Sequence, residues 1–200
     1  MPEPQAGAGG KVLRLSINSF FQGTAMSFTF FLLQVYGVER FGFSPMEVAL
    51  SISLGGFSTA LTQPAWGWLV DKTRRARLLV LIGYTIAGAF VYVTYNSRSP
   101  LEFYLANAGL NAFIGLSNSS WLTIVGDLTK LEGRGRVSGI TATSMTLGTA
   151  IFSPLAGIIM DAYGYHPASL VALSQFALAA GTVCLIPSVE VGGWTGSAID

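Results

Sequence analysis

Two stretches of the chain are long, apolar and without a single charged residue. One runs from Phe103 to Gly126 and the other from Val137 to Met160. Each exceeds the ~20 residues that a helix needs to cross the hydrocarbon core of a bilayer. The whole chain is also poor in charge, since Lys, Arg, Asp and Glu make up 10% of its 200 residues, against about 25% in a typical soluble domain. The sequence therefore predicts an all-α membrane protein.

Short breaks that hold charges or turn residues divide the chain into six apolar segments. Ser44-Pro45 and Ser99-Pro100 each supply a helix cap followed by Pro in the first helical turn. We expect six transmembrane helices at about residues 15–38, 47–70, 78–95, 101–128, 137–163 and 167–187. Residues 1–14 and 188–200 are predicted to be flexible tails, which leaves residues 15–187 as a single six-helix bundle.

The basic residues predict how this bundle is oriented in the membrane. Nine of the eleven fall on one side, namely Lys11, Arg14, Lys72, Arg74, Arg75, Arg77, Lys130, Arg134 and Arg136. Only Arg40 and Arg98 fall on the other side. Because Lys and Arg are retained in the cytoplasm during insertion, we expect cytoplasmic termini and a multi-pass protein in the inner or plasma membrane of the cell. The formal net charge of +1 gives no sign of a nucleic-acid partner.

The loop from Gly67 to Arg77 carries a distinctive pattern. It reads Gly-Trp-Leu-Val-Asp-Lys-Thr-Arg-Arg-Ala-Arg, with Asp71 four residues after Gly67 and a basic cluster behind it. This pattern resembles the loop between the second and third helices of major facilitator superfamily transporters. The family pattern has a second Gly three residues after the Asp, where this chain has Arg74.

Two further stretches resemble the same family. Residues 126–136 resemble the loop between its fourth and fifth helices, and residues 148–165 resemble its fifth helix, with a Pro-x-x-Gly kink. The resemblance extends over residues 15–187. Family members usually have twelve helices in two six-helix halves, so the resemblance implies that this chain supplies one half.

The function that the resemblance implies is secondary transport of a small solute by alternating access. One bundle cannot enclose a site between two halves, so we expect a homodimer, a partner half on a separate chain, or a truncated gene product. A non-transporting membrane scaffold or assembly subunit is the alternative, and a channel is a third possibility.

Five residues at the predicted cytoplasmic end are candidates for a conformational latch. In the family, carboxylates at this end pair with Arg and hold the cytoplasmic side shut, which implies a latch role for Asp71 and Arg75, and a companion latch of Asp127 with Arg134 or Arg136. Gly67 would let its helix approach a neighbour closely. The alternative is that the basic residues of this loop are solvated and only set the topology.

Two polar stripes are candidates for a solute site. Asn107, Asn111 and Asn118 share one face of the fourth helix, and Asn18 and Gln22 share one face of the first. In the family these two helices line the central cavity, so the five amides could hydrogen-bond a polar solute. Hydrogen bonds between helices, each contributing ~0.6 kcal/mol, explain the stripes equally well.

The sequence offers no constellation for catalysis. The one histidine, His166, has no nucleophile near it, and the single cysteine excludes a multi-Cys zinc site. A phosphate-binding Gly-rich loop that ends in Lys-Ser/Thr is also absent. We therefore expect no enzyme activity, no cofactor and no metal. No ionisable residue lies near the middle of a predicted span, which argues against proton coupling through this half alone. The uncharged polar stripes favour a neutral or weakly charged solute, unless a partner half supplies charges.

Overall fold

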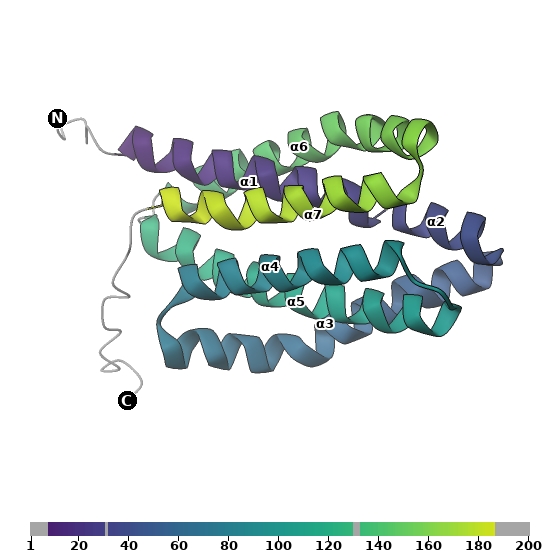
Figure 1. Ribbon diagram of the computed structural model, residues 1–200. Helices are drawn as coiled ribbons and strands as arrows, with labels where there is room; N and C mark the ends of the chain where they lie inside the picture. Colours follow the sequence, from purple (N-terminus) through teal and green to yellow (C-terminus); the bar gives the residue numbers. More distant parts are fainter. Residues whose placement is uncertain (1–7, 31, 130–132, 187–200) are drawn as a thin grey trace, which may run out of the picture.

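The computed structural model describes residues 8–30, 32–129 and 133–186 (Figure 1). Every regular element in these ranges is helical, as the sequence predicted. The elements are α1 (Ala8–Phe30), α2 (Leu32–Phe41), α3 (Pro45–Thr73), α4 (Ala76–Tyr95), α5 (Pro100–Leu128), α6 (Arg134–Tyr163), α7 (Tyr165–Thr182) and the short 3-10 helix η2 (Val183–Leu185).

Helices α3 to α7 match the last five predicted segments closely, and the first predicted segment falls on α1 and α2. Because α1 begins at Ala8, residues 8–14, which we assigned to a tail, are helical. Residues 1–7 and the predicted tail at 188–200 lie outside the described residues. Three helical segments are long and apolar enough to cross a membrane, namely Ala76–Tyr95, Arg134–Tyr163 and Tyr165–Leu185. Six transmembrane helices therefore stay a prediction.

Local sequence signals set the starts of α3 and α5. The Ser44 hydroxyl accepts a hydrogen bond from the backbone N–H of Glu47, and the Glu47 carboxylate accepts one from the backbone N–H of Ser44 at 2.8 Å. Ser99 caps α5 in the same way, with the N–H of Glu102 as donor. In both helices Pro follows the cap, where its missing N–H costs nothing. The predicted caps are confirmed.

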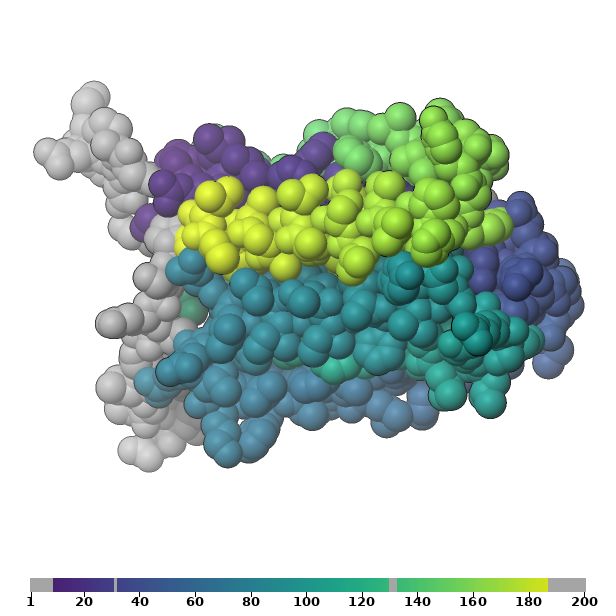
Figure 2. All heavy atoms as spheres, in the orientation of Figure 1, coloured from purple at the N-terminus to yellow at the C-terminus, as the bar shows by residue number. Residues whose placement is uncertain are grey.

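The helices form two layers of three (Figure 1). One layer contains α1, α6 and α7, and the other contains α3, α4 and α5. Contacts between α4 and α7 join the layers, with Tyr84 of α4 against Phe176 of α7 at 6.1 Å between ring centroids. Figure 2 shows α4 and α7 side by side along the middle of one face of the bundle.

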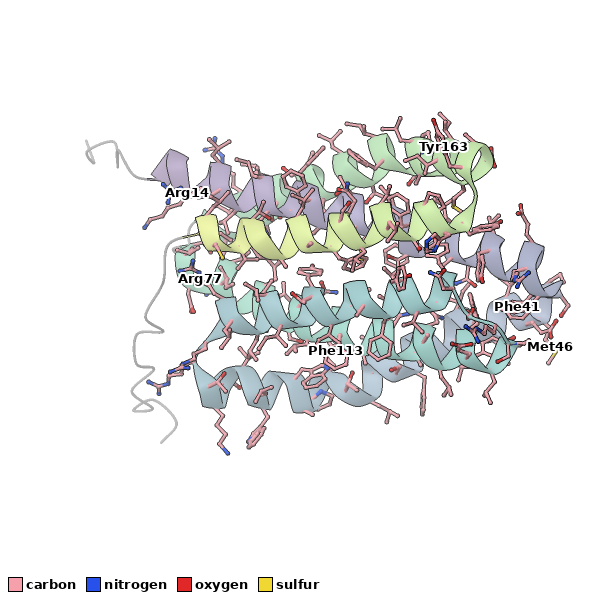
Figure 3. All side chains as sticks on the ribbon, in the orientation of Figure 1. Arg14, Phe41, Met46, Arg77, Phe113 and Tyr163 are labelled. Carbon is pink, nitrogen blue, oxygen red and sulfur yellow. The ribbon has the colours of Figure 1, made fainter. Side chains whose placement is uncertain are left out.

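The bundle has two ends, which we name after residues labelled in Figure 3. The Arg77 end holds the start of α1 and the end of α7, where Arg14 and Arg77 donate to the carbonyls of Leu185 and Cys184. The Phe41 end holds α2, the start of α3 and the turn between α6 and α7. Arg40 and Arg98 lie at the Phe41 end, so the charge segregation read from the sequence is present in space. The direction of the bundle in a membrane stays a prediction.

Helices α1 and α6 cross at two glycines that face each other's backbone. A Cβ on Gly23 would overlap the carbonyl oxygen of Met145, and a Cβ on Gly148 would overlap that of Phe20. The hydroxyl of Thr149 donates to the carbonyl of Gly23 at 3.0 Å across this crossing. Small residues allow this backbone approach, which is a common way to pack helices in membranes.

Helices α3 and α6 are the least covered elements of the bundle. In α3 only Ser51, Gly55 and Val70 are buried, although the helix has 29 residues. In α6, which has 30 residues, the buried positions are Thr141, Gly148, Ala156 and Met160. Their outer faces carry exposed large apolar side chains, such as Phe57 and Ile158. Most of the surface of α3 and α6 is therefore available to lipid or to another bundle.

Candidate functional site

The α3–α4 loop at the Arg77 end turns at Arg74. This residue has φ 52° and ψ 22°, the left-handed conformation, and its N–H closes the last turn of α3 on the carbonyl of Val70 at 3.0 Å. It is the one non-glycine residue with positive φ in the described ranges. Glycine adopts this conformation without a Cβ clash. The geometry explains why a Gly is expected at this position, and Arg74 occupies it at a conformational cost.

The latch candidates of this loop lie on the surface. Asp71 and Arg75 are exposed, and no salt bridge joins them within the described part of the chain. The carboxylate of Asp71 is in the last turn of α3, where the helix dipole disfavours a negative charge. Neighbouring Lys72 instead lies over the ring of Trp68, with its Nζ 4.5 Å from the ring centroid. The pairing partner expected for Asp71 is thus not supplied by Arg75.

Gly67 does not make the close approach that we expected from it. A Cβ at this position would meet no atom of the described chain within 4 Å. The glycine is half-buried, yet no atom of α4 or α5 lies within 4 Å of its Cβ position. The prediction was wrong for contacts within this bundle, because the sequence pattern does not say which face of α3 is covered.

The second pair of latch candidates lies close together at the same end. Asp127 and Arg134 both line a cavity of 440 Å³ between the end of α5 and the start of α6. The guanidinium of Arg134 donates to the carbonyl of Gly126 at 3.0 Å, and no salt bridge to Asp127 is present in the described structure. The sequence thus predicted their proximity, and the structure leaves the Asp127 carboxylate open to another partner.

The amides of α1 are used inside the bundle. Asn18 is fully buried, and its Nδ2 donates to the carbonyl of Ala179 and to the hydroxyl of Thr182, both at 2.8 Å on α7. Gln22 donates to the side-chain oxygen of Asn18 at 2.6 Å. Of the two functions that the sequence left open for Asn18 and Gln22, the hydrogen bonds between helices are present.

Two amides of α5 pack against α3. Asn107 is buried and donates to the carbonyl and the hydroxyl of Ser51, both at 3.0 Å. Asn111 donates to the carbonyl and side-chain oxygen of Asn107, and its side chain lies against Gly55. These contacts place both residues in the α3–α5 junction.

Asn118 differs from the other four amides. It lies on the same helix face as Asn111, seven residues further along α5, but it is exposed. Leu122, one turn later, is 66% exposed and lines the cavity of Asp127 and Arg134. Asn118 is therefore the one predicted solute-binding amide that can reach a molecule outside the bundle without breaking a contact described here.

One recurrence escaped the sequence analysis. Residues 64–71 of α3 and 154–161 of α6 both read Pro-x-x-Gly-x-x-x-Asp. Because α3 and α6 run in opposite directions, Asp71 lies at the Arg77 end and Asp161 at the Phe41 end. Comparing the sequence with itself at an offset of 90 residues would have revealed the match. It places an Asp with the same helical surroundings at each end of the bundle.

Comparisons with known proteins agree with this architecture. MFSD1 of Danio rerio, a lysosomal dipeptide transporter, is 29% identical over 137 residues, which cover 66% of this chain and 28% of MFSD1. MFSD1 of Homo sapiens is 30% identical over a stretch of the same length and coverage. The multi-drug resistance efflux pump PmrA of Streptococcus pneumoniae is 27% identical over 178 residues, which cover 84% of this chain and 43% of PmrA. The chain thus spans less than half the length of these relatives.

The sequence profile of the Major Facilitator Superfamily matches residues 15–197. This range includes every predicted latch and solute-binding residue. The match confirms the resemblance carried by the loop from Gly67 to Arg77 and agrees with a bundle of long apolar helices. The chain belongs to the Major Facilitator Superfamily of membrane transporters.

Proposed function

We propose that this protein moves a small solute across a membrane, as one six-helix half of a transporter that works by alternating access. The observation that carries the proposal is the open surface of α3 and α6. In these helices of 29 and 30 residues few positions are fully buried, and more than half of the residues of each are exposed. Membrane helices pack through small residues, and Gly56, Gly67, Gly139 and Gly157 on these helices all have free space around them.

The occupant of this surface is a second six-helix unit, either another copy of this chain or a separate half. Its relatives MFSD1 and PmrA are more than twice as long as the segment that they share with this chain, so they have room for two such units. A solute site then forms between the units, and rocking of one against the other exposes it to each side in turn.

The latch residues act at the junction between the two units. Asp71 and Asp127 are exposed carboxylates at the Arg77 end, and neither forms a salt bridge with its expected partner in the same chain. An Arg or a helix N-terminus of the second unit supplies the missing positive charge when that end is closed. Arg75 and Arg134 make the reciprocal contacts to the second unit.

Asn118 is the solute-binding residue that the structure supports best. Its amide can donate and accept hydrogen bonds, and its exposed position on α5 faces away from α3 and α4 contacts. Behind the site, the helices are held together by the hydrogen bonds of Asn18, Gln22, Asn107 and Asn111. The relatives transport dipeptides or drugs, as their names state, so we propose a small organic solute and expect the protein in the inner or plasma membrane.

Uptake into proteoliposomes tests transport, with a labelled dipeptide and a fluorescent drug as probes. Asn118→Ala should lower uptake at least about tenfold by removing hydrogen bonds made to the solute. Asp71→Asn should slow turnover, and Thr85→Ala, on the far face of α4, should leave uptake unchanged. Saturable flux with counterflow supports a transporter. Flux without saturation indicates a channel, and absence of flux with both probes counts against this function.

Cross-linking tests the second unit. In a Cys184→Ser background, Gly56→Cys places a thiol on the open face of α3, and Thr85→Cys places one on α4. A bismaleimide should join two chains through Gly56→Cys in native membranes but not through Thr85→Cys. A protein that transports as a strict monomer would contradict the proposed two-unit arrangement.

A further inference from the structure

The two basic residues that break the charge distribution lie in one cavity. Arg40 and Arg98 are the only Lys or Arg residues at the Phe41 end among those the structure describes, and both line a cavity of 600 Å³ between α2, α4 and α7. The one histidine of the chain, His166, lines it as well. The remaining lining residues are Tyr36, Tyr92, Tyr95, Asn96, Ser97 and Tyr165.

The walls of this cavity are fixed by hydrogen bonds. Tyr95 donates to the carbonyl of Phe28 at 2.5 Å, Tyr36 donates to that of Ser97 at 3.2 Å, and Tyr165 donates to the carboxylate of Glu39. The rings of Tyr36 and Tyr165 are in edge contact, with 4.7 Å between centroids. The cavity is thus an aromatic cup in which three of the four phenol groups, those of Tyr36, Tyr95 and Tyr165, donate to the protein.

The histidine is oriented by Asn96. The Asn96 amide nitrogen donates to the carbonyl of Tyr92 and to the hydroxyl of Ser169, so its oxygen is the atom that faces Nδ1 of His166 at 3.0 Å. An amide oxygen only accepts hydrogen bonds, and Nδ1 therefore carries the proton. In the neutral ring Nε2 is then an acceptor, so His166 can donate to an oxyanion only in its imidazolium form.

The charges of the cavity favour an anion. No carboxylate lines it. Three carboxylates lie close by. Glu39 accepts from Tyr165, Glu102 accepts from the backbone N–H of Arg98 at 2.7 Å, and Asp161 interacts electrostatically with Tyr165, so the positive charges of the lining itself are those of the two arginines. Neither guanidinium forms a salt bridge with a carboxylate of the described residues. Paired guanidinium groups are well suited to a phosphate, because each can donate two parallel hydrogen bonds.

The surroundings favour a phosphate that belongs to a lipid. The cavity lies where α4 and α7 meet, and these helices are among the three segments apolar enough to span a membrane. Val93 of α4 and Leu170 of α7 expose apolar surface directly next to the lining residues. Tyrosine rings concentrate at the headgroup level of bilayers. A phospholipid could therefore place its headgroup in the cup and its acyl chains along α4 and α7 (Figure 2).

We propose that the cavity of Arg40, Arg98 and His166 binds a phosphate oxyanion, supplied by the headgroup of an anionic phospholipid. The two guanidinium groups hold the phosphate oxygens, and the tyrosine rings enclose the headgroup. This site is separate from the solute site and does not depend on transport.

Native mass spectrometry of the purified full-length protein tests the proposal, with phosphatidylglycerol and phosphatidylcholine added in equal amounts. The wild type should retain phosphatidylglycerol preferentially, and Arg40→Gln/Arg98→Gln should retain about tenfold less or lower still. The matched control is Arg74→Gln/Arg136→Gln, which removes two exposed arginines from the opposite end and should retain lipid like the wild type. Arg40→Lys/Arg98→Lys keeps the charge and should show an intermediate loss.

Titration of delipidated protein with inorganic phosphate, followed by thermal unfolding, distinguishes the source of the phosphate. Lipid retention that depends on Arg40 and Arg98 supports the lipid headgroup. Stabilisation by phosphate that depends on both arginines, without lipid retention, supports a soluble phosphate in the same site. The proposal is overturned if Arg40→Gln/Arg98→Gln and the wild type show the same lipid retention and the same stabilisation by phosphate. It is also overturned if the control Arg74→Gln/Arg136→Gln loses as much lipid as Arg40→Gln/Arg98→Gln. If circular dichroism shows that Arg40→Gln/Arg98→Gln is misfolded, Arg40→Lys/Arg98→Lys is compared with the wild type in both assays instead. Equal behaviour of that variant and the wild type then overturns the proposal.

Discussion

The α1–α6 and α3–α5 pairs both pack through glycine, but the glycines meet different partners. Gly23 and Gly148 face the backbone of the opposite helix, which cannot move without shifting the whole helix. Gly55 faces the side chain of Asn111, which can rotate. The first junction is therefore fixed in its geometry, whereas the second can adjust. In a bundle that rocks as one body, α1–α6 is the rigid part and α3–α5 is the part that can accommodate change.

The largest effect is expected at the rigid junction. Gly23→Ala or Gly148→Ala puts a methyl group into a backbone carbonyl, which should lower the free energy of unfolding by about 3 kcal/mol or more. Thermal unfolding in mild detergent measures the change. Gly181→Ala is the control, because a Cβ at that position on α7 meets nothing within 4 Å. If Gly23→Ala and Gly148→Ala have the same melting temperature as Gly181→Ala, the two helices are not in close backbone contact at the α1–α6 crossing.

The adjustable junction should tolerate the same change better. Gly55→Ala places its methyl group 2.7 Å from Nδ2 of Asn111, and we expect a loss of about 1–2 kcal/mol as the amide moves. In Gly55→Ala/Asn111→Ala the clash is gone, so the combined loss should be smaller than the sum of the single losses. Strict additivity would show that the amide does not relax.

A smaller effect separates the buried amides from the exposed one. Asn18→Ala removes two hydrogen bonds to α7, each contributing ~0.6 kcal/mol in membrane proteins, so the variant should lose roughly 1 kcal/mol. Asn118→Ala should change stability by less than about 0.5 kcal/mol. Chemical denaturation of both variants in detergent makes the comparison. If Asn118→Ala is clearly destabilised, the amide of Asn118 stabilises the bundle and is not available to a solute.

The smallest effect concerns the ends of α3 and α6. Arg74 and Gly164 both have positive φ, at 52° and 82°. Arg74→Gly relieves the left-handed strain of about 1–2 kcal/mol, but glycine costs about 0.5–1 kcal/mol in chain entropy. A net gain of about 0.5 kcal/mol should appear as a slightly higher melting temperature. Gly164→Ala should lower the melting temperature by more than this gain, because φ 82° with ψ −177° is a conformation that essentially only glycine adopts. A neutral result there would contradict the strain argument.

The sequence predicted the helices and their ends well, because run length, caps and charge are local properties. It also predicted that Asp127 and Arg134 lie together, since only a short connection separates them. It could not predict how each helix is rotated. Asn107 and Asn118 share one stripe, yet one is buried and the other exposed, because α5 contacts α3 over only part of its length.

The prediction that Gly67 makes a close helix contact was wrong for the same reason, because the sequence does not show how each helix is rotated. Gly67 is part of a distinctive loop pattern, whereas Gly23 has no pattern around it, and only the packing identifies Gly23 as the close contact. The cavity of Arg40 and Arg98 was equally hidden. Its residues come from α2, α4 and α7, which are far apart in the sequence.

The position of α1 has a consequence for biosynthesis. This helix is made first, but its partners α6 and α7 are made last, and the hydrogen bond from Thr149 to Gly23 spans 126 residues. At a synthesis rate of about 5–20 residues per second, roughly 8–33 seconds separate the synthesis of Asn18 from that of its partners Ala179 and Thr182 on α7. During that interval the amide of Asn18 lacks its α7 acceptors, so the polar face of α1 is covered only after the last helix has been made.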